Sequence, residues 1–315
     1  MTVDTKPTVA LVGAGSIGVG WAIVFARAGH PVRLFDVSAE TLSRAPSAIG
    51  GRLAALADAG LISETPAAVA ARVTTHTELA VAVGGATLVL EQVPETPDLK
   101  RAVFAELDRL TQPDAVLASS SSSIPASIFA EGLAGRARCL VAHPANPPYL
   151  IPVVEIVPAP FTAPEATARA RSLISAAGQE PVTLRRELCG FVYNRLQGAM
   201  LREAYCLLRD GVVSVADLDR LVTHGLGLRY SLIGPFETSD LNYRGGLAEH
   251  ADRMAANYAA MGAERGQNDP WTPELVAEAV AQRRAALPLD RWEERVAWRD
   301  RELMALLAFR RSRGL

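Results

Sequence analysis

The sequence predicts an α/β Rossmann-type doubly wound domain followed by an all-α C-terminal domain. Through residue 187, short apolar runs alternate with helical stretches, which is the pattern of a parallel sheet covered by helices. From residue 188 onward, apolar residues recur at intervals of three and four, and almost no strand signal remains. We therefore predict a first domain over residues 1–187 and a helical second domain over residues 188–315.

The expected elements follow one another in a regular order. Apolar runs predict strands at residues 8–13, 31–36, 86–94, 115–120, 138–144, 152–158 and 180–184. Helical spacing predicts helices at residues 20–29 and 98–110, and one or two helices within the alanine-rich residues 39–72. In the second domain, residues 189–211 form a helix that ends at Gly211, and Ser214 with Asp217 begins the next.

The composition is that of a soluble globular protein, with 49% hydrophobic and 21% charged residues. A net charge of −2 gives no electrostatic footprint for nucleic acid or an anionic membrane. The N-terminal stretch lacks a signal-peptide pattern, and no apolar run reaches the roughly 20 residues that span a bilayer. The cysteines and histidines show no metal-ligand spacing. We therefore expect a cytoplasmic protein with free thiols and no metal.

A glycine-rich turn between the first strand and the first helix predicts a dinucleotide site. Gly13 permits the tight turn, Gly15 lets the backbone approach a pyrophosphate, and Gly18 lets helix and strand pack closely. The second strand ends at Asp36, where an acid that bonds the ribose 2′-hydroxyl belongs; a carboxylate repels a 2′-phosphate, so we predict NAD rather than NADP. A turn without a ligand is the alternative, but the flanking strands and helix agree with the glycine spacing. The turn residues expected to bind NAD are Gly13, Gly15, Ser16, Ile17 and Gly18.

A candidate proton-transfer pair lies in the stretch HPANPPYLIPVVE, which opens with His143 and closes with Glu155. His143 ends an apolar strand, where a dinucleotide-binding domain carries its chemistry, and imidazole titrates near working pH. A carboxylate on the other ring nitrogen would fix the tautomer and stabilise the imidazolium. The alternatives are a buried core histidine and a surface glutamate on an edge strand.

The glycine turn, HPANPP with PVVEIVP, and GFVYNRL together resemble the 3-hydroxyacyl-CoA dehydrogenase superfamily. The stretches HGLGLRYSLIGPFETSDLN and WRDRELM resemble its lambda-crystallin/L-gulonate 3-dehydrogenase branch. The resemblance extends nearly end to end. It implies a two-domain oxidoreductase that uses NAD and forms a homodimer through its apolar helical half.

The resemblance also implies roles for individual residues. His143 would be the acid/base and Glu155 its orienting partner, while Ser122 and Asn194 would bond the substrate oxygen that becomes the carbonyl. From the residues alone, the serine run reads as a flexible loop and Asn194 as an ordinary polar helix residue. Further residues are implied beside the nicotinamide and its ribose, Glu95 and Lys100, and at the substrate, Asn146.

The substrate is expected to be a small 3-hydroxy acid or 3-keto acid. Residues 37–72 hold three arginines and no lysine, a sparse set for the phosphates of coenzyme A. In the second domain, Arg229 is a candidate partner for a free carboxylate, and a helix-surface cation is the alternative. We favour reversible oxidation of a free L-3-hydroxy acid at C3, with L-gulonate as the best guess. A 3-hydroxyacyl-CoA dehydrogenase and a non-catalytic, crystallin-like NAD-binding protein are the rival interpretations.

Overall fold

The computed structural model describes residues 6–231, 233–243, 246–266 and 288–313, together with residues 274, 277, 278, 280, 281 and 285. By its internal contacts the chain divides into two compact units. One comprises residues 1–195 and 297–315, and the other comprises residues 196–296. The first unit therefore extends a few residues beyond position 187 and also takes in the C-terminal segment.

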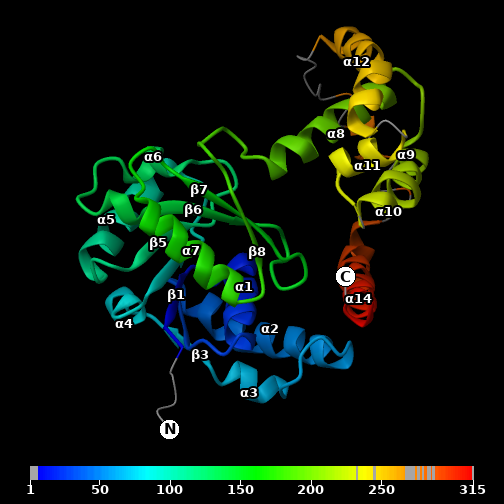
Figure 1. Ribbon diagram of the computed structural model, residues 1–315. Coiled ribbons are helices and arrows are strands. Elements are labelled where there is room, and N and C mark those ends of the chain that lie inside the picture. The colour runs from blue at the N-terminus through cyan, green and yellow to red at the C-terminus, as the bar shows by residue number, and fades with distance from the viewer. Residues whose placement is uncertain are drawn as a thin grey trace. The chain divides into compact units, whose positions relative to one another are not determined.

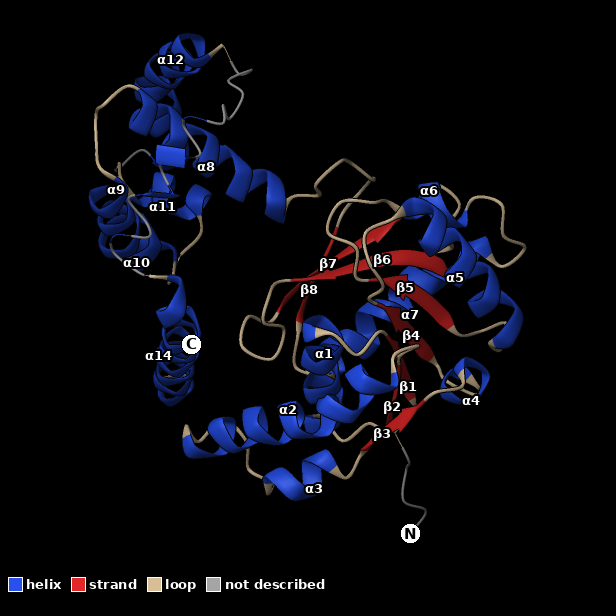
Figure 2. Ribbon diagram, turned by 180° about the vertical axis from the view of Figure 1, so that it is seen from behind, coloured by secondary structure: helices blue, strands red, loops and turns tan. Residues whose placement is uncertain are grey.

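The first unit is built on one eight-stranded sheet in the order β3-β2-β1-β4-β5-β6-β7-β8 (Figure 1). All neighbouring strands are parallel except β6 and β7. This mostly parallel sheet, with helices on both faces, confirms the predicted Rossmann-type class (Figure 2). The strands are β1 (Val9–Val12), β2 (Val32–Phe35), β3 (Val73–His76), β4 (Leu88–Glu91), β5 (Val116–Ser119), β6 (Cys139–Pro144), β7 (Val153–Pro158) and β8 (Glu180–Thr183).

Two apolar layers hold the helices to the sheet. The layer on one face includes Trp21, Leu34 and Leu53, and the layer on the other face includes Val89 and Phe104, all buried. The first face carries α1 (Ser16–Arg27), α2 (Ala39–Asp58), α3 (Pro66–Ala70) and α7 (Pro164–Ala176). The second carries α4 (Leu79–Val83), α5 (Pro97–Leu110) and α6 (Ala126–Ala130), and the short 3₁₀ turn η1 (Arg136–Arg138) leads into β6.

Two features of the sheet differ from a simple reading of the sequence. The edge strand β3 was not expected, because its sequence VTTH is half-exposed and offers no apolar run. Strand β7 runs antiparallel to β6, because the segment between them, residues 145–152, is too short for a crossover helix. This hairpin brings the chain straight back beside the end of β6.

The second unit is helical over its described residues, as predicted. Helix α8 (Tyr193–Arg209) enters it from the first unit and is followed by Gly211 with φ +69°. The backbone N–H of Asp217 donates to the Ser214 hydroxyl at 3.1 Å, which is the predicted N-terminal cap of the next helix. The remaining elements are α9 (Val215–Leu221), the π-helical turn η2 (Val222–Leu226), α10 (Gly227–Tyr230), α11 (Pro235–Leu241), α12 (Gly246–Arg265), η3 (Leu289–Arg291) and α14 (Trp292–Ser312).

The last helix returns to the first unit. Met304 of α14 is buried in the apolar layer that also holds α1 and α2, and Arg311 donates to the carbonyl oxygen of Leu61 at 3.1 Å. Among the described residues, no helix combines the length and the apolar character that crossing a membrane requires.

Candidate active site

The glycine turn between β1 and α1 is shaped by close backbone contacts. Gly13 has φ +116°, a value that side chains disfavour. A Cβ atom at Gly18 would lie 1.9 Å from the carbonyl oxygen of Gly13, so only glycine fits there. A Cβ atom at Gly15 would meet nothing within 4 Å. Gly15 therefore leaves open space in front of the first amides of α1, where an anion is favoured.

Asp36, directly after β2, is fixed beside this turn. Its carboxylate accepts hydrogen bonds from the backbone N–H of Ala14 at 2.8 Å and of Ser38 at 2.9 Å. Ser16 and Ile17 form the first turn of α1, the first exposed and the second half-buried. The turn, the open helix N-terminus and the fixed carboxylate fit the pyrophosphate and the ribose of a dinucleotide.

His143 and Glu155 are direct cross-strand partners in the β6–β7 hairpin. Nδ1 of His143 lies 2.8 Å from a carboxylate oxygen of Glu155, and both side chains are buried. The other carboxylate oxygen of Glu155 accepts the backbone N–H groups of Val192 at 2.7 Å and Tyr193 at 2.9 Å. Each oxygen of Glu155 thus has its own partners, and the imidazole is held in one orientation.

The segment before α8 supplies those two backbone donors. Phe191 is buried and adopts φ +50°, which is unusual for a residue with a side chain. Its ring packs 5.6 Å from the His143 ring, centroid to centroid. The motif GFVYNRL therefore acts partly through its backbone and its apolar ring. A motif match shows the asparagine readily and gives no sign of these backbone bonds.

Hydrogen bonding decides the ionisation of Glu155. Burial alone would raise the pKa of this carboxyl group. The hydrogen bonds from His143, Tyr193 and Val192 outweigh burial and hold the pKa of Glu155 below its usual value. The carboxylate is therefore charged near neutral pH.

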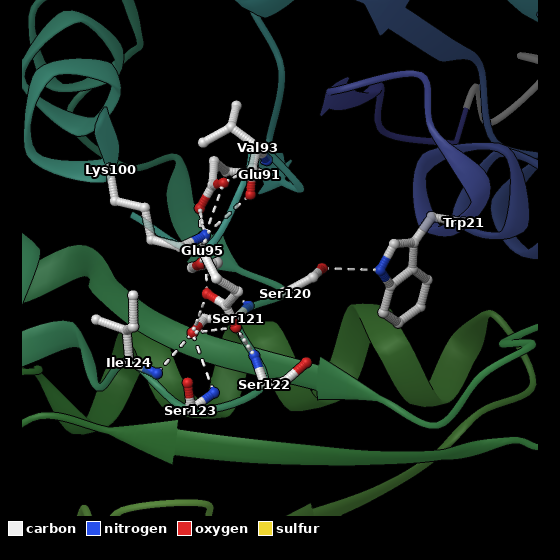
Figure 3. Close-up of polar contacts among 11 residues, drawn as sticks. Trp21, Glu91, Val93, Glu95, Lys100, Ser120, Ser121, Ser122, Ser123 and Ile124 are labelled. Atoms are coloured by element: carbon white, nitrogen blue, oxygen red, sulfur yellow. Dashed lines mark hydrogen bonds and ion pairs between the residues drawn. The ribbon is translucent and has the colours of Figure 1, made fainter. Parts of the chain in front are cut away.

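A second cluster surrounds the serine loop, which we define as residues 119–124 (Figure 3). Glu95 accepts the Ser121 hydroxyl at 2.9 Å and also the backbone N–H of Ser122. On the other side of Ser122, the amide of Asn194 donates to its carbonyl oxygen at 2.8 Å. The structure thus brings Glu95, Ser122 and Asn194 together, and the backbone of Ser122 is fixed at both its N–H and its carbonyl.

A buried ion pair that the sequence did not reveal contacts this loop. The ammonium of Lys100, with 1% of its side chain exposed, lies 3.0 Å from Glu91, 3.6 Å from Glu95 and 3.2 Å from the hydroxyl of Ser119. Burial raises the pKa of Glu91, and Lys100 and Ser119 oppose that shift. A charged residue inside the apolar run of β4, nine positions before a lysine, was the available signal.

Two further predicted substrate residues are exposed, each within its own unit. Asn146 is exposed in the β6–β7 hairpin, three positions after His143. Arg229 is exposed on α10 of the second unit. The described residues contain no group of three or more histidine, cysteine, aspartate or glutamate side chains that could hold a metal ion.

Comparison with known families identifies the family to which this chain belongs. Residues 8–188 match the family model of the 3-hydroxyacyl-CoA dehydrogenase NAD binding domain, and residues 190–287 match that of its C-terminal domain. The chain belongs to the 3-hydroxyacyl-CoA dehydrogenase family. As in this family, the cofactor of the protein is NAD, and the turn at Gly13 to Gly18 with Asp36 fits it.

Individual relatives resemble this chain over most of its length. Lambda-crystallin of Oryctolagus cuniculus is 38% identical over 309 residues, 96% of each chain. L-Carnitine dehydrogenase of Streptomyces griseus subsp. griseus is 38% identical over 272 residues, 85% of this chain and 78% of that protein. The solved structure of 5-formyl-3-hydroxy-2-methylpyridine 4-carboxylic acid 5-dehydrogenase, an NAD+-dependent dismutase, aligns with a TM-score of 0.83 at 29% identity and covers 96% of this chain and 98% of its own.

The glycine turn generates a first prediction. Gly18→Ala places a methyl group against backbone, so we expect it to lower both stability, by about 1–3 kcal/mol, and NAD affinity. Gly15→Ala enters open space and should leave the stability of the NAD-free protein within about 0.5 kcal/mol while weakening NAD binding. Thermal unfolding without NAD and titration with NAD measure the two effects. A strongly destabilised Gly15→Ala variant would contradict the open-space argument.

The choice of cofactor gives a second prediction. Asp36→Ala removes the group that repels a 2′-phosphate, so the preference for NAD over NADP should fall by about tenfold or more. The measurement is the ratio of kcat/KM for the two cofactors. Glu40→Ala, which removes a neighbouring exposed carboxylate, is the control and should keep the wild-type ratio. An Asp36→Ala enzyme that still strongly prefers NAD refutes the assignment.

The lowered pKa of Glu155 gives a third prediction. A carboxyl group with a lowered folded pKa stabilises the fold above its unfolded pKa, about 4.3, and loses that contribution as pH falls through the folded value. We expect Glu155→Gln to reduce the free energy of unfolding by about 2 kcal/mol at pH 7. The difference from wild type should shrink below about pH 4.3. Denaturant unfolding of both proteins at pH 7 and at a pH below about 4.3 measures the difference in the free energy of unfolding. An equal difference at the two pH values contradicts the charge-based account.

Proposed function

We propose that this protein catalyses the reversible, NAD-dependent oxidation of the 3-hydroxyl group of a free L-3-hydroxy acid to the 3-keto acid. The observation that carries the proposal is the 2.8 Å contact between His143 Nδ1 and Glu155, at the carboxyl end of β6. In this fold class, chemistry takes place at the carboxyl ends of the parallel strands, beside the cofactor. The pair supplies an imidazole base there, with its partner fixed.

Proton transfer follows from the hydrogen bonds of the pair. An ionised Glu155 can only accept, so Nδ1 of His143 carries a proton and the neutral ring leaves Nε2 as the acceptor. Nε2 takes the proton of the substrate hydroxyl, and the resulting imidazolium faces the carboxylate of Glu155. Because the second oxygen of Glu155 is held by two backbone N–H groups, the carboxylate cannot turn away during the transfer. Bound NAD supplies the hydride acceptor for the substrate carbon.

The serine loop and α8 would hold the substrate oxygen. Asn194 uses one amide hydrogen on the carbonyl of Ser122 and has a second one to donate. Ser122 is exposed, and its hydroxyl is the second donor that we propose. Two donors on one oxygen stabilise the developing carbonyl, and in the reverse direction they polarise it.

The arginines after β2 favour a free acid over a thioester. Arg44 pairs with Glu40, the guanidinium of Arg72 donates to Glu64 at 2.9 Å, and the guanidinium of Arg52 lies 5.5 Å from the ring centroid of Tyr149. Each of these cations therefore has a protein partner, and coenzyme A phosphates would have to compete for it. We assign the free carboxylate of the substrate to Arg229, with Asn146 as a further polar contact.

The relatives offer two substrate classes. L-Carnitine, named for one relative, is a free 3-hydroxy acid, which supports our choice, and L-gulonate is our best guess among such acids. A 3-hydroxyacyl-CoA dehydrogenase of Gibberella moniliformis, 35% identical over 316 residues, supports the thioester alternative. The likeness to lambda-crystallin keeps a non-catalytic NAD-binding role as the third candidate.

We further propose a cytoplasmic homodimer. Exposed large apolar residues of the second unit, such as Leu221 and Phe236, supply surface that a second copy could bury. Burial raises the pKa of the Cys139 thiol to about 12, which makes it unreactive, and Cys189 is a free, exposed thiol. An exposed free thiol suits a reducing compartment.

A substrate panel tests the proposed function. NADH production should be compared for L-gulonate, L-3-hydroxybutyrate, L-carnitine and L-3-hydroxybutyryl-CoA, and we expect a free acid to give the highest kcat/KM. His143→Asn should lower kcat by about 10²–10⁴-fold without changing the Kd of NAD, whereas His76→Asn, a control on β3, should behave as wild type.

Each rival has its own outcome in this experiment. If the coenzyme A ester gives the highest kcat/KM, the protein is a thioester dehydrogenase and the free-acid argument is refuted. Tight NAD binding without turnover of any compound supports the non-catalytic role. Unchanged turnover in His143→Asn removes the acid/base pair from the mechanism.

A further inference from the structure

Besides the bond from Asn194 to Ser122, the serine loop is fastened to the rest of the first unit on two further sides (Figure 3). On one side, Glu91 accepts a hydrogen bond from the hydroxyl of Ser119 at 2.6 Å, and Glu95 accepts one from the hydroxyl of Ser121 at 2.9 Å. The Ser121 hydroxyl accepts in turn from the backbone N–H of Ile124 at 2.8 Å. These bonds tie the loop to the segment between β4 and α5.

On the other side, the loop is tied to the cofactor helix by one indole. Nε1 of Trp21 donates to the hydroxyl oxygen of Ser120 at 3.0 Å across 99 positions of sequence (Figure 3). Trp21 is fully buried, and a buried indole N–H requires an acceptor. The residue stands in α1, six positions beyond Gly15 at the open N-terminus of that helix.

The serines of the loop differ in their hydrogen bonds to other elements, and Ser120 is the one whose hydroxyl contacts Trp21. Each of the four residues Ser119 to Ser122 forms a hydrogen bond to another element through its side chain or its backbone. Within the described part of the chain, the exposed Ser123 forms no hydrogen bond to another element. The hydroxyl of Ser120 accepts from Trp21, while its backbone N–H donates to the carbonyl oxygen of Glu91 at 2.8 Å. The indole bond therefore links the loop that carries Ser122 to the helix that receives the cofactor.

We propose that Trp21 is a positioning residue that sets the place of the Ser122 hydroxyl relative to the bound dinucleotide. By holding Ser120, the indole stops the loop from shifting as one body with the β4–α5 segment. Hydride transfer depends on such distances, since misplacement of about 1 Å can slow a reaction by about 10²-fold. The inference rests on the proposed role of Ser122 at the substrate oxygen.

A double-mutant cycle tests the link. The variants are Trp21→Phe, which keeps a buried ring without the donor, Ser120→Ala, which removes the acceptor, and the double variant. Ser123→Ala is the matched control, with the same change in the same loop. We expect each single variant to lower kcat for the best panel substrate by about three- to tenfold with an unchanged Kd for NAD. The double variant should be no slower than the slower single variant, because both changes break one bond.

The kinetic outcomes separate positioning from general damage. Losses that multiply in the double variant, a loss in Ser123→Ala equal to that in Ser120→Ala, or wild-type kcat in both single variants overturn the proposal. Ser120→Ala leaves the apolar core intact, so it remains informative if Trp21→Phe folds poorly. Melting temperatures of all variants identify such a case.

A direct structural readout keeps the inference separate from the proposed function. Amide hydrogen exchange of residues 119–124 should be faster in Trp21→Phe and in Ser120→Ala than in wild type and Ser123→Ala. If the wild-type enzyme oxidises nothing in the panel, the proposed function fails, while exchange still reports on the link. Unchanged exchange in both single variants overturns the link whatever the activity.

Discussion

The candidate site depends above all on the cross-strand pairing of His143 with Glu155. In an antiparallel pair, directly opposed residues point to the same face with Cβ atoms about 4.5–5.5 Å apart, close enough for an imidazole to meet a carboxylate. A slip of one residue would turn Glu155 to the other face. The register is held beyond the pair by the backbone N–H of Ala145, which donates to Val153 at 3.1 Å. The reversal of β7 is thus what places an acid beside the histidine.

Two buried acids at this edge of the sheet are neutralised in different ways. Glu91 meets the ammonium of Lys100, a buried fixed charge that hydrogen bonds hold in place. Glu155 meets an imidazole, which takes up and releases the proton in the proposed reaction, and two backbone N–H groups that hold the other oxygen of the carboxylate. The Glu91–Lys100 pair is suited to hold the serine loop in place, and the Glu155–His143 pair is suited to repeated proton transfer.

The sequence predicted most of the sheet, the glycine turn and the His143–Glu155 pair, because each is marked by local periodicity or by a short motif. It missed β3, whose exposed edge carries no apolar run. It predicted that the chain returns beside His143 but not that β7 pairs antiparallel with β6. It also missed Glu91 and Trp21, which lie inside apolar runs and look like core positions. Their partners are distant in sequence, 99 positions away for Trp21, and only the fold brings such groups together.

The structure gives Lys100 a different environment from the one that the family resemblance implied. Family resemblance implied a lysine beside the nicotinamide, yet 1% of this side chain is exposed, whereas 39% of the Glu95 side chain is exposed. The ammonium lies between Glu91 and Glu95 and compensates the charge of both. Of the two residues, Glu95 is therefore the one that solvent reaches, and Lys100 lies buried behind it. The same carboxylate holds Ser121 and Ser122, so the serine loop is fixed by Glu95 at one part and by Trp21 at another, and the buried ammonium supports the loop through Glu95.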